Sequence, residues 1–590
     1  MVEKDNCNLR GKTAAFLRYI IAALLFSIVF EALSLFFTDN QMYGPDGSVV
    51  AMRIVNWFRM AVWFGLSLLI LFCRKNIWNF FIGSSKYVSK KDICDMVFLE
   101  AGILFGGFVI LKLIGTMILR YHLILLVCFG LFIIVEYYYF RGKIQNAETM
   151  FLLTAMLVSV CYIFTAPVFV MGGDQGIHFR RTVELAQSYQ EAEFESEQES
   201  YNEEGTNVLI EKMDHAIIEA DKDPIYSYTE SKPLKLSSLR YIAYIPPAAA
   251  LAVADAINMP PAAAYFAGQL CNAFVYIFLI YQGARKLKAG KLTLIMFASL
   301  PRMLFLATRY SYTPWVVAWM TFAGACIIGE TQRPDKMVGW KDMLVIAGSF
   351  LAGMLVKAPY FLMIPIALLI TGQKFKNLNL YRKYMVLMGG TMLVLLMTLI
   401  IPIFVNERGF DIYSDVRGGT NVNAFGQMKF IVMHPVKYAG ILLRNIYRLF
   451  SFSAFVVGKD GFTGIRAGMP GVLPTIVLLL FVWVIITDKK VNSESGLRGK
   501  ERVLVFGLTF VNICWICTVM YMNYSEVGAA VISGCNPMYL MAFMFPFFYY
   551  CRSRHVQSNF NWRMYNTVIY GMFMIIMFAN IYVRIINMYV

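Results

Sequence analysis

Residues 121–140 read YHLILLVCFGLFIIVEYYYF, an apolar run with a single acidic side chain, Glu136. A helix rises 1.5 Å per residue, so a run of about twenty residues crosses the roughly 30 Å hydrocarbon core of a bilayer. Strands of transmembrane barrels instead alternate apolar and polar residues. Because the run shows no such alternation, it predicts a membrane-spanning helix.

The composition of the whole chain agrees with this prediction. Of its 590 residues, 58% are hydrophobic and only 15% are charged. A soluble fold of this size buries about three quarters of its surface, which would leave much of this apolar area in water. Disordered, collagen-like, disulfide-rich secreted and cytosolic proteins are therefore excluded. The expected fold class is all-α, a polytopic integral membrane protein.

Similar runs predict about 13–15 transmembrane helices. The first run is long enough to span and lacks the small-residue cleavage site of a signal peptide, so it is expected to stay in the chain. The predicted spans lie near residues 13–37, 54–73, 96–117, 121–140, 148–171, 262–284, 289–306, 313–329, 342–356, 358–372, 384–405, 472–487, 502–522, 536–551 and 565–585.

The net charge of +16 is concentrated in basic blocks between these runs. With the predicted spans every block falls on one side, which the positive-inside rule makes cytoplasmic, together with the N-terminus. This distribution is typical of a protein whose partner is the lipid bilayer, and it argues against nucleic acid as a partner. The blocks are Lys4–Lys12, Arg74–Lys91, Arg141–Lys143, Arg285–Lys291, Arg333–Lys341, Lys374–Lys383, Lys489–Arg502 and Arg552–Arg563.

Two large extracytoplasmic loops are then expected on the other side, over residues 172–259 and 406–471. The first is strongly acidic, and its end, from Tyr241, is apolar but is expected to lie shallowly without crossing. In the second, residues 427–452 repeat apolar residues with a helical period and carry Lys and Arg on the other face. This pattern predicts a helix lying in the membrane interface.

The first outer loop opens with the candidate chemistry: Asp174, His178, Arg180 and Arg181 lie within eight residues. On a helix, Asp174 and His178 would be one turn apart. A carboxylate can deprotonate a hydroxyl, and guanidinium groups bind phosphate in pairs of hydrogen bonds. The alternative is structural, with Asp174 as a helix N-cap and the arginines facing lipid headgroups.

Further candidates lie at predicted outer ends of spans. Arg309, followed by Tyr312 in ATRYSYT, either contacts phosphate or anchors an aromatic belt. Lys357, in the stretch KAPY that ends at Tyr360, either neutralises phosphate or extends to the interface.

Two pairs of residues within predicted spans are interpreted structurally. Glu31 and Arg59 lie toward the outer halves of the first two spans and are expected to pair. Cys514 and Cys517 form a C-x-x-C inside a span, where they are expected to be small apolar fillers rather than a redox or zinc site.

A family resemblance joins these pieces. The string GDQGIHFRR, at residues 173–181, resembles the P-D-E-x-x-H-F-R motif of the bacterial membrane family called Domain of Unknown Function 2142. Further segments resemble that family in the same order, over roughly residues 148–550. They are the stretch from Tyr241, SLPRMLFLATRYSYTPWVVA at 299–318, VKAPY at 356–360 and EVGAAVISGCNPMYLMAFMFP at 526–546.

The resemblance implies a GT-C-like glycosyltransferase bundle over residues 148–590, with residues 1–147 adding extra spans. It implies transfer of a sugar from a polyprenyl-phosphate donor to a glycan acceptor at the outer face of a bacterial cell membrane. Asp174 would be the base, with His178 beside it. Arg180, Arg181, Arg309 and Lys357 would hold phosphate, with Tyr312 and Tyr360 also contacting substrate. No cofactor is expected, and a divalent cation stays an alternative.

The chain departs from the family pattern at three polar positions, where it has Gln175, Thr313 and Met538. With these departures, fewer acidic side chains remain as ligands for a hard cation. Loss of catalysis, as in a membrane scaffold, is therefore an alternative to the enzyme. A polymerase or ligase of lipid-linked glycans, and a flippase or transporter for them, would share the predicted topology and stay open as well.

Overall fold

The computed structural model describes residues 19–31, 59–72, 90–115, 119–165, 175–186, 191–192, 226–227, 241–257, 259, 261–404, 422–449, 472–488, 499–553, 556 and 559–589. These residues are helical throughout, apart from turns and one antiparallel pair of two-residue strands, β1 (Glu191–Ala192) and β2 (Tyr226–Ser227). The expected all-α class is confirmed.

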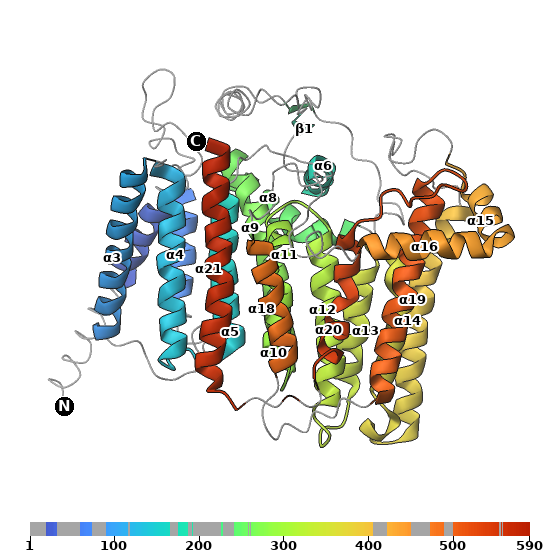
Figure 1. Ribbon diagram of the computed structural model, residues 1–590. Coiled ribbons are helices and arrows are strands. Elements are labelled where there is room, and N and C mark those ends of the chain that lie inside the picture. Colours follow the sequence, from blue (N-terminus) through green and yellow to red (C-terminus); the bar gives the residue numbers. More distant parts are fainter. Residues whose placement is uncertain are drawn as a thin grey trace, which may run out of the picture.

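The long helices stand side by side in a broad bundle (Figure 1). Seven helices of the described residues are long and apolar enough to cross a membrane unaided. The polytopic class is therefore confirmed. The bundle helices are α3 (Lys90–Ile114), α4 (Leu119–Phe140), α5 (Ala147–Thr165), α9 (Pro261–Lys286), α12 (Thr313–Thr331), α13 (Trp340–Met354), α14 (Leu378–Phe404), α18 (Leu473–Thr487), α19 (Gly499–Tyr524), α20 (Met541–Tyr550) and α21 (Trp562–Tyr589).

Between α9 and α14, two predicted spans are built differently from single α-helices. The run near 289–306 is divided into α10 (Lys291–Ala298) and α11 (Pro301–Ala307), because Pro301 lacks an N–H and holds Leu300 in an extended conformation. The run near 358–372 forms the 3₁₀ helix η3 (Ala358–Leu369), which contains Pro365. A 3₁₀ helix rises about 2 Å per residue, so η3 is longer than an α-helix with as many residues.

The break between α10 and α11 lies in the buried core, where side chains form hydrogen bonds around it. The Tyr276 hydroxyl of α9 donates to the Ala298 carbonyl at 2.9 Å. The Ser299 hydroxyl lies 3.3 Å from the Tyr570 hydroxyl of α21, which also meets Thr154 of α5 at 3.2 Å. Backbone groups inside a bilayer have no water to bond, so the Tyr276 hydroxyl supplies the Ala298 carbonyl with a partner where the helix stops.

At the edge of the bundle, α3 exposes large apolar side chains such as Phe98 and Leu113, as expected of a lipid-facing helix. The helices Tyr19–Glu31 and Arg59–Phe72 are joined by the predicted pair of charges. The Arg59 guanidinium donates hydrogen bonds from two of its nitrogens to Glu31, one of them at 2.8 Å, and both residues are buried.

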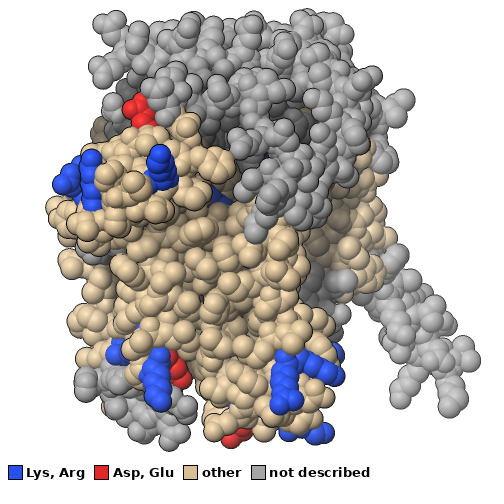
Figure 2. Space-filling view, turned by 90° about the vertical axis from the view of Figure 1, so that its right-hand side faces the viewer, with Lys and Arg blue, Asp and Glu red and all other residues tan. Residues whose placement is uncertain are grey.

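One end of the bundle carries α6 (Gln175–Ala186) and the helices α15 (Ala424–Met433) and α16 (Pro435–Leu449), which lie across it (Figure 1). We call it the α6 end. The predicted interfacial helix is found there, but Pro435 divides it in two. Ile441, Asn445 and Leu449 are buried, while the polar face carries Lys437 and Arg444. Figure 2 shows basic side chains at this end, separated by a wide band without charged side chains from the basic side chains of the opposite end.

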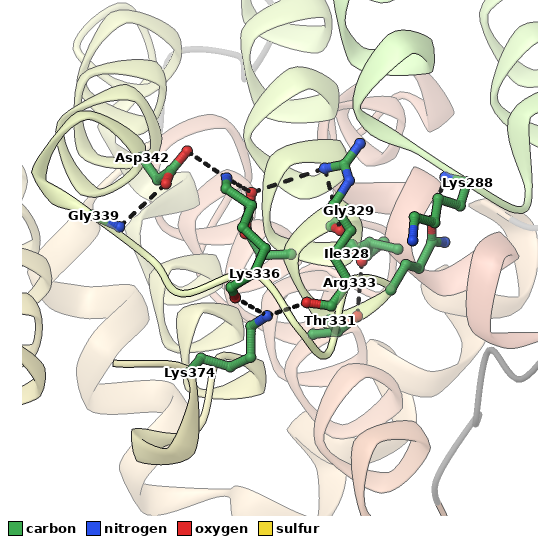
Figure 3. A network of polar contacts seen from close by, with 11 residues as sticks. Lys288, Ile328, Gly329, Thr331, Arg333, Lys336, Gly339, Asp342 and Lys374 are labelled. Carbon is green, nitrogen blue, oxygen red and sulfur yellow. Dashed lines mark hydrogen bonds and ion pairs between the residues drawn. The ribbon is translucent and has the colours of Figure 1, made fainter. Parts of the chain in front are cut away.

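We call that opposite end the Lys336 end. There the Lys336 ammonium group joins α12 to α13, donating to Glu330 at 2.5 Å and to Asp342 at 2.8 Å (Figure 3). Lys374 donates to the carbonyls of Arg333 and Lys336 and so attaches the next loop (Figure 3). Lys288 lies beside this network, where its N–H donates to Gln332 (Figure 3). Described residues of the predicted basic blocks at 285–291, 333–341 and 374–383 thus meet at one end.

Substitution of Lys336 by Met is expected to destabilise the fold. The Glu330 side chain is only 4% exposed and would lose its closest donor. A buried carboxylate that loses a partner costs about 1–3 kcal/mol. Chemical unfolding in detergent measures this loss, with Lys341→Met, at an exposed position in the first turn of α13, as the control that is expected to change stability by less than about 0.5 kcal/mol. Equal effects of the two variants would contradict the role given to Lys336.

Candidate functional site

α6 is held against the bundle by one of its faces. Phe179 packs edge-on against Tyr310 and Tyr265, with ring centres 4.8 Å and 5.0 Å apart. Val183, one turn later, packs into the cluster of α8 (Ile245–Ala256) and α9. This spacing of four residues puts both apolar side chains, and their neighbours His178 and Thr182, on the bundle side. α8 has 12 residues, too few to cross a bilayer, which agrees with the shallow placement predicted for this segment.

His178 lies at the centre of the contacts between α6 and the bundle. Its Nδ1 is 2.7 Å from the Tyr244 hydroxyl, and its ring meets that of Tyr312 edge-on at 5.1 Å. Burial, together with the positive charges of Arg181 and Lys357, lowers the pKa of His178 to about 3. The imidazole is therefore neutral at pH 7 and acts as a hydrogen-bonding group.

Lys357 approaches the same place from the turn before η3. Its ammonium group donates to the Tyr312 hydroxyl at 3.2 Å and lies 3.4 Å from the centre of the Tyr539 ring. Tyr539 is fixed there because the buried Tyr360 hydroxyl donates to its carbonyl at 2.9 Å. A cation on an aromatic face is stabilised by the ring quadrupole. Of the two predicted roles, these inward contacts favour a part in the site over extension to the interface.

Two of the predicted arginines lie over aromatic rings. The guanidinium carbon of Arg181 is 5.8 Å from the centre of the Tyr241 ring, and its charge acts on both His178 and Tyr244. Arg309 is more deeply placed, only 4% exposed, with its guanidinium carbon 4.8 Å from the Phe305 ring centre. Arg309 is therefore buried within the protein.

Six side chains thus converge at the α6 end from five separate segments of the chain. We call them the Tyr312 cluster: His178, Arg181, Tyr244, Tyr312, Lys357 and Tyr539. Tyr360 supports the cluster because its hydroxyl donates to the Tyr539 carbonyl. Asp174, which directly precedes α6 in the sequence, lies outside the described residues, as does the side chain of Arg180.

Sequence reasoning missed Tyr244 and Tyr539 as members of the site. Both lie in segments that carry the family resemblance, but tyrosine is so frequent in this chain that neither stood out. It also missed two buried arginines, Arg302 and Arg584. Arg302 donates to Asn536, and Arg584 lies over the same Phe305 ring as Arg309. Their position within apolar runs was the available signal.

Two of the three departures from the family pattern lie directly beside the cluster. Thr313 follows Tyr312 and begins α12, and Met538 precedes Tyr539 in the 3₁₀ turn η7 (Pro537–Leu540). The Met538 N–H donates to Asn536, which caps that turn. Within the described part of the chain, no three His, Cys, Asp or Glu side chains are grouped closely enough to share a metal ion.

The fold and the cluster define a multi-pass membrane protein with a polar site at the ends of its helices. A family model described as "Predicted membrane protein (DUF2142)" matches residues 156–546, more than half of the chain and the whole Tyr312 cluster. The chain therefore belongs to this family, as the resemblance predicted. Neither the curated proteins nor the solved structures include a match.

Acidification is expected to destabilise the protein through His178. The imidazole titrates near pH 6.5 when unfolded and near pH 3 in the fold, so the unfolded chain binds the proton first as the pH falls. The stability contributed by the neutral ring is complete above pH 6.5 and decreases by about 1.4 kcal/mol per pH unit below it. Between pH 7.5 and 5, unfolding in detergent should show a loss about 2 kcal/mol larger for the wild type than for His178→Gln. Identical pH profiles would contradict the buried neutral imidazole.

Proposed function

We propose that this protein is a membrane glycosyltransferase of the GT-C type. It transfers a sugar from a polyprenyl-phosphate donor to a cell-surface glycan or a lipid-linked acceptor, on the extracytoplasmic side of a bacterial membrane. The observation that carries the proposal is the convergence of two cations, Arg181 and Lys357, with His178 and the hydroxyls of Tyr244 and Tyr312 at one end of a bilayer-spanning bundle.

The charge distribution supports an outer position for this site. The short basic loops gather at the Lys336 end, and the positive-inside rule assigns such loops to the cytoplasm. The Tyr312 cluster lies at the opposite end, where a bacterial cell has no nucleotide sugars. A donor that carries its own activated phosphate in the membrane meets this constraint.

The cluster has the groups that a departing lipid phosphate needs. When the bond between the anomeric carbon and the phosphate oxygen breaks, negative charge develops on that oxygen. Lys357 and Arg181 supply positive charge, and the Tyr312 hydroxyl supplies a further donor beside Lys357. Charge-assisted hydrogen bonds in a half-buried site stabilise such charge more strongly than they would in water.

The acceptor hydroxyl needs a base, and Asp174 has the appropriate chemistry. It is the acidic residue of the string GDQGIHFRR and directly precedes α6 in the sequence. The first turn of α6 contains His178. The neutral imidazole, with a pKa of about 3, is too weak a base for this step at pH 7. Asp174 would accept the hydroxyl proton as the oxygen bonds to the anomeric carbon, while His178 positions the start of α6 through Tyr244.

Replacement of Asp174 by Asn tests the base. Purified protein in nanodiscs would be given a radiolabelled polyprenyl-phosphate sugar and a glycan acceptor. Loss of general-base catalysis is expected to lower kcat by about 10²–10⁴-fold while folding is unchanged. An unchanged rate would contradict the assignment. Movement of the lipid between leaflets without sugar transfer would indicate a flippase. The absence of both activities would indicate a scaffold.

Replacement of Lys357 by Met tests the phosphate site. The variant keeps the approximate length of the side chain but removes the charge, and kcat/KM for the donor is expected to fall by about 10–100-fold, the worth of one charged hydrogen bond. Lys341→Met, at the opposite end of the bundle, is the matched control and should leave kcat/KM unchanged. Equal kinetics of the two variants would remove Lys357 from the site.

A further inference from the structure

Two cysteines from different segments meet beside the Tyr312 cluster. Cys517 is fully buried on α19, and Cys535 is half-buried in the turn that precedes η7. Their sulfur atoms are 3.8 Å apart. The pair differs from the C-x-x-C that the sequence displays, because Cys514 lies one turn before Cys517 on the same helix and Cys535 arrives through a returning loop.

The loop between the two cysteines is fixed in this return path. The Tyr521 hydroxyl donates to the Ala529 carbonyl at 2.8 Å, and the Ser533 N–H donates to the Ser525 hydroxyl at 3.0 Å. Gly534, directly before Cys535, has a φ of 70°, in the left-handed region that favours glycine. The two sulfur atoms are therefore close because this hydrogen-bonded loop folds back onto α19.

The surroundings give the two thiols different chemical characters. The hydrogen bond from Cys517 and the positive charge of Lys357 lower the pKa of the Cys535 thiol. A partly accessible thiol near a positive charge is the one that attacks an oxidant, whereas a buried thiol does not react first. Cys535 thus has the character of an attacking thiol, and Cys517 lies where a resolving thiol is needed.

We propose that Cys517 and Cys535 are a redox modification site that closes to a reversible disulfide. The Cys535 thiolate attacks a small disulfide oxidant, forms a mixed disulfide and releases one thiol. Cys517 then loses its proton, attacks the Cys535 sulfur and releases the second thiol, so two thiols and one disulfide exchange into one disulfide and two thiols. Each sulfur has to move by only about 1 Å to reach the bonding distance of roughly 2 Å.

The bond would connect α19 to the segment that carries the aromatic partner of Lys357. Tyr539 follows Cys535 by four residues, and Asn536 between them caps η7 and accepts a hydrogen bond from Arg302. Closing the disulfide fixes this segment at its start. The outer face of a bacterial membrane is an oxidising environment, so this role rests on the orientation given under the proposed function.

The experiment uses the full-length protein in detergent, treated with hydroxyethyl disulfide and digested at Glu526, which lies between the two cysteines. We expect the two fragments to remain joined in non-reducing mass spectrometry and to separate with dithiothreitol. Cys517→Ser and Cys535→Ser should each abolish the joined product. Cys514→Ser, one helical turn away, is the matched control and should retain it.

Three results would overturn the proposal. They are a lasting mixed disulfide at Cys535 in the wild type, a joined product that survives Cys517→Ser, and a joined product that requires Cys514. The first is measured on the unaltered chain, so a variant that fails to fold does not obscure it. Because no result depends on sugar transfer, failure of the disulfide and failure of the glycosyltransferase assignment are distinguishable.

Discussion

The structure depends on one constraint, that a backbone carbonyl or N–H in the hydrocarbon core must find its partner within the protein. Uninterrupted helices satisfy it along their length. Where the helix after α9 stops at Ala298, a side chain meets the constraint instead, because the Tyr276 hydroxyl donates to the Ala298 carbonyl. The short helix α11 follows this break and leads to the turn that carries Tyr312.

The same constraint concentrates polar chemistry at the helix ends. Turns need water or side-chain partners, so they lie where the bundle meets the aqueous phase. At the α6 end, four such connections converge: the start of α8, the turn before α12, the turn before η3 and the turn η7. Each contributes one member of the Tyr312 cluster, and α6 closes over them with His178 and Arg181. At the Lys336 end, the corresponding loops are joined by salt bridges.

Much of the fold and part of the site could be predicted from the sequence. Apolar runs predict spans because their length matches the bilayer, and the Glu31–Arg59 pair follows from the cost of isolated charges there. Lys357 and Tyr312 were predicted separately as outer-end residues, and the structure brings them into contact. Tyr244, Tyr539 and the Cys517–Cys535 pair could not be predicted, because their partners are distant in the sequence and a loop path decides the meeting. Pro301 was visible, but only the packed core shows how a break there is tolerated.

The central claim is that a lipid-borne phosphate binds at the Tyr312 cluster. The most direct measurement is photo-crosslinking, in nanodiscs, with a polyprenyl phosphate that bears a photoreactive group beside its phosphate, followed by identification of the labelled peptides. The account predicts labels in α6, in the turn before α12 and around Lys357 and Tyr539, suppressed by an excess of unlabelled lipid. Labels confined to the loops around Lys336 and Lys374, at the opposite end of the bundle, would contradict it.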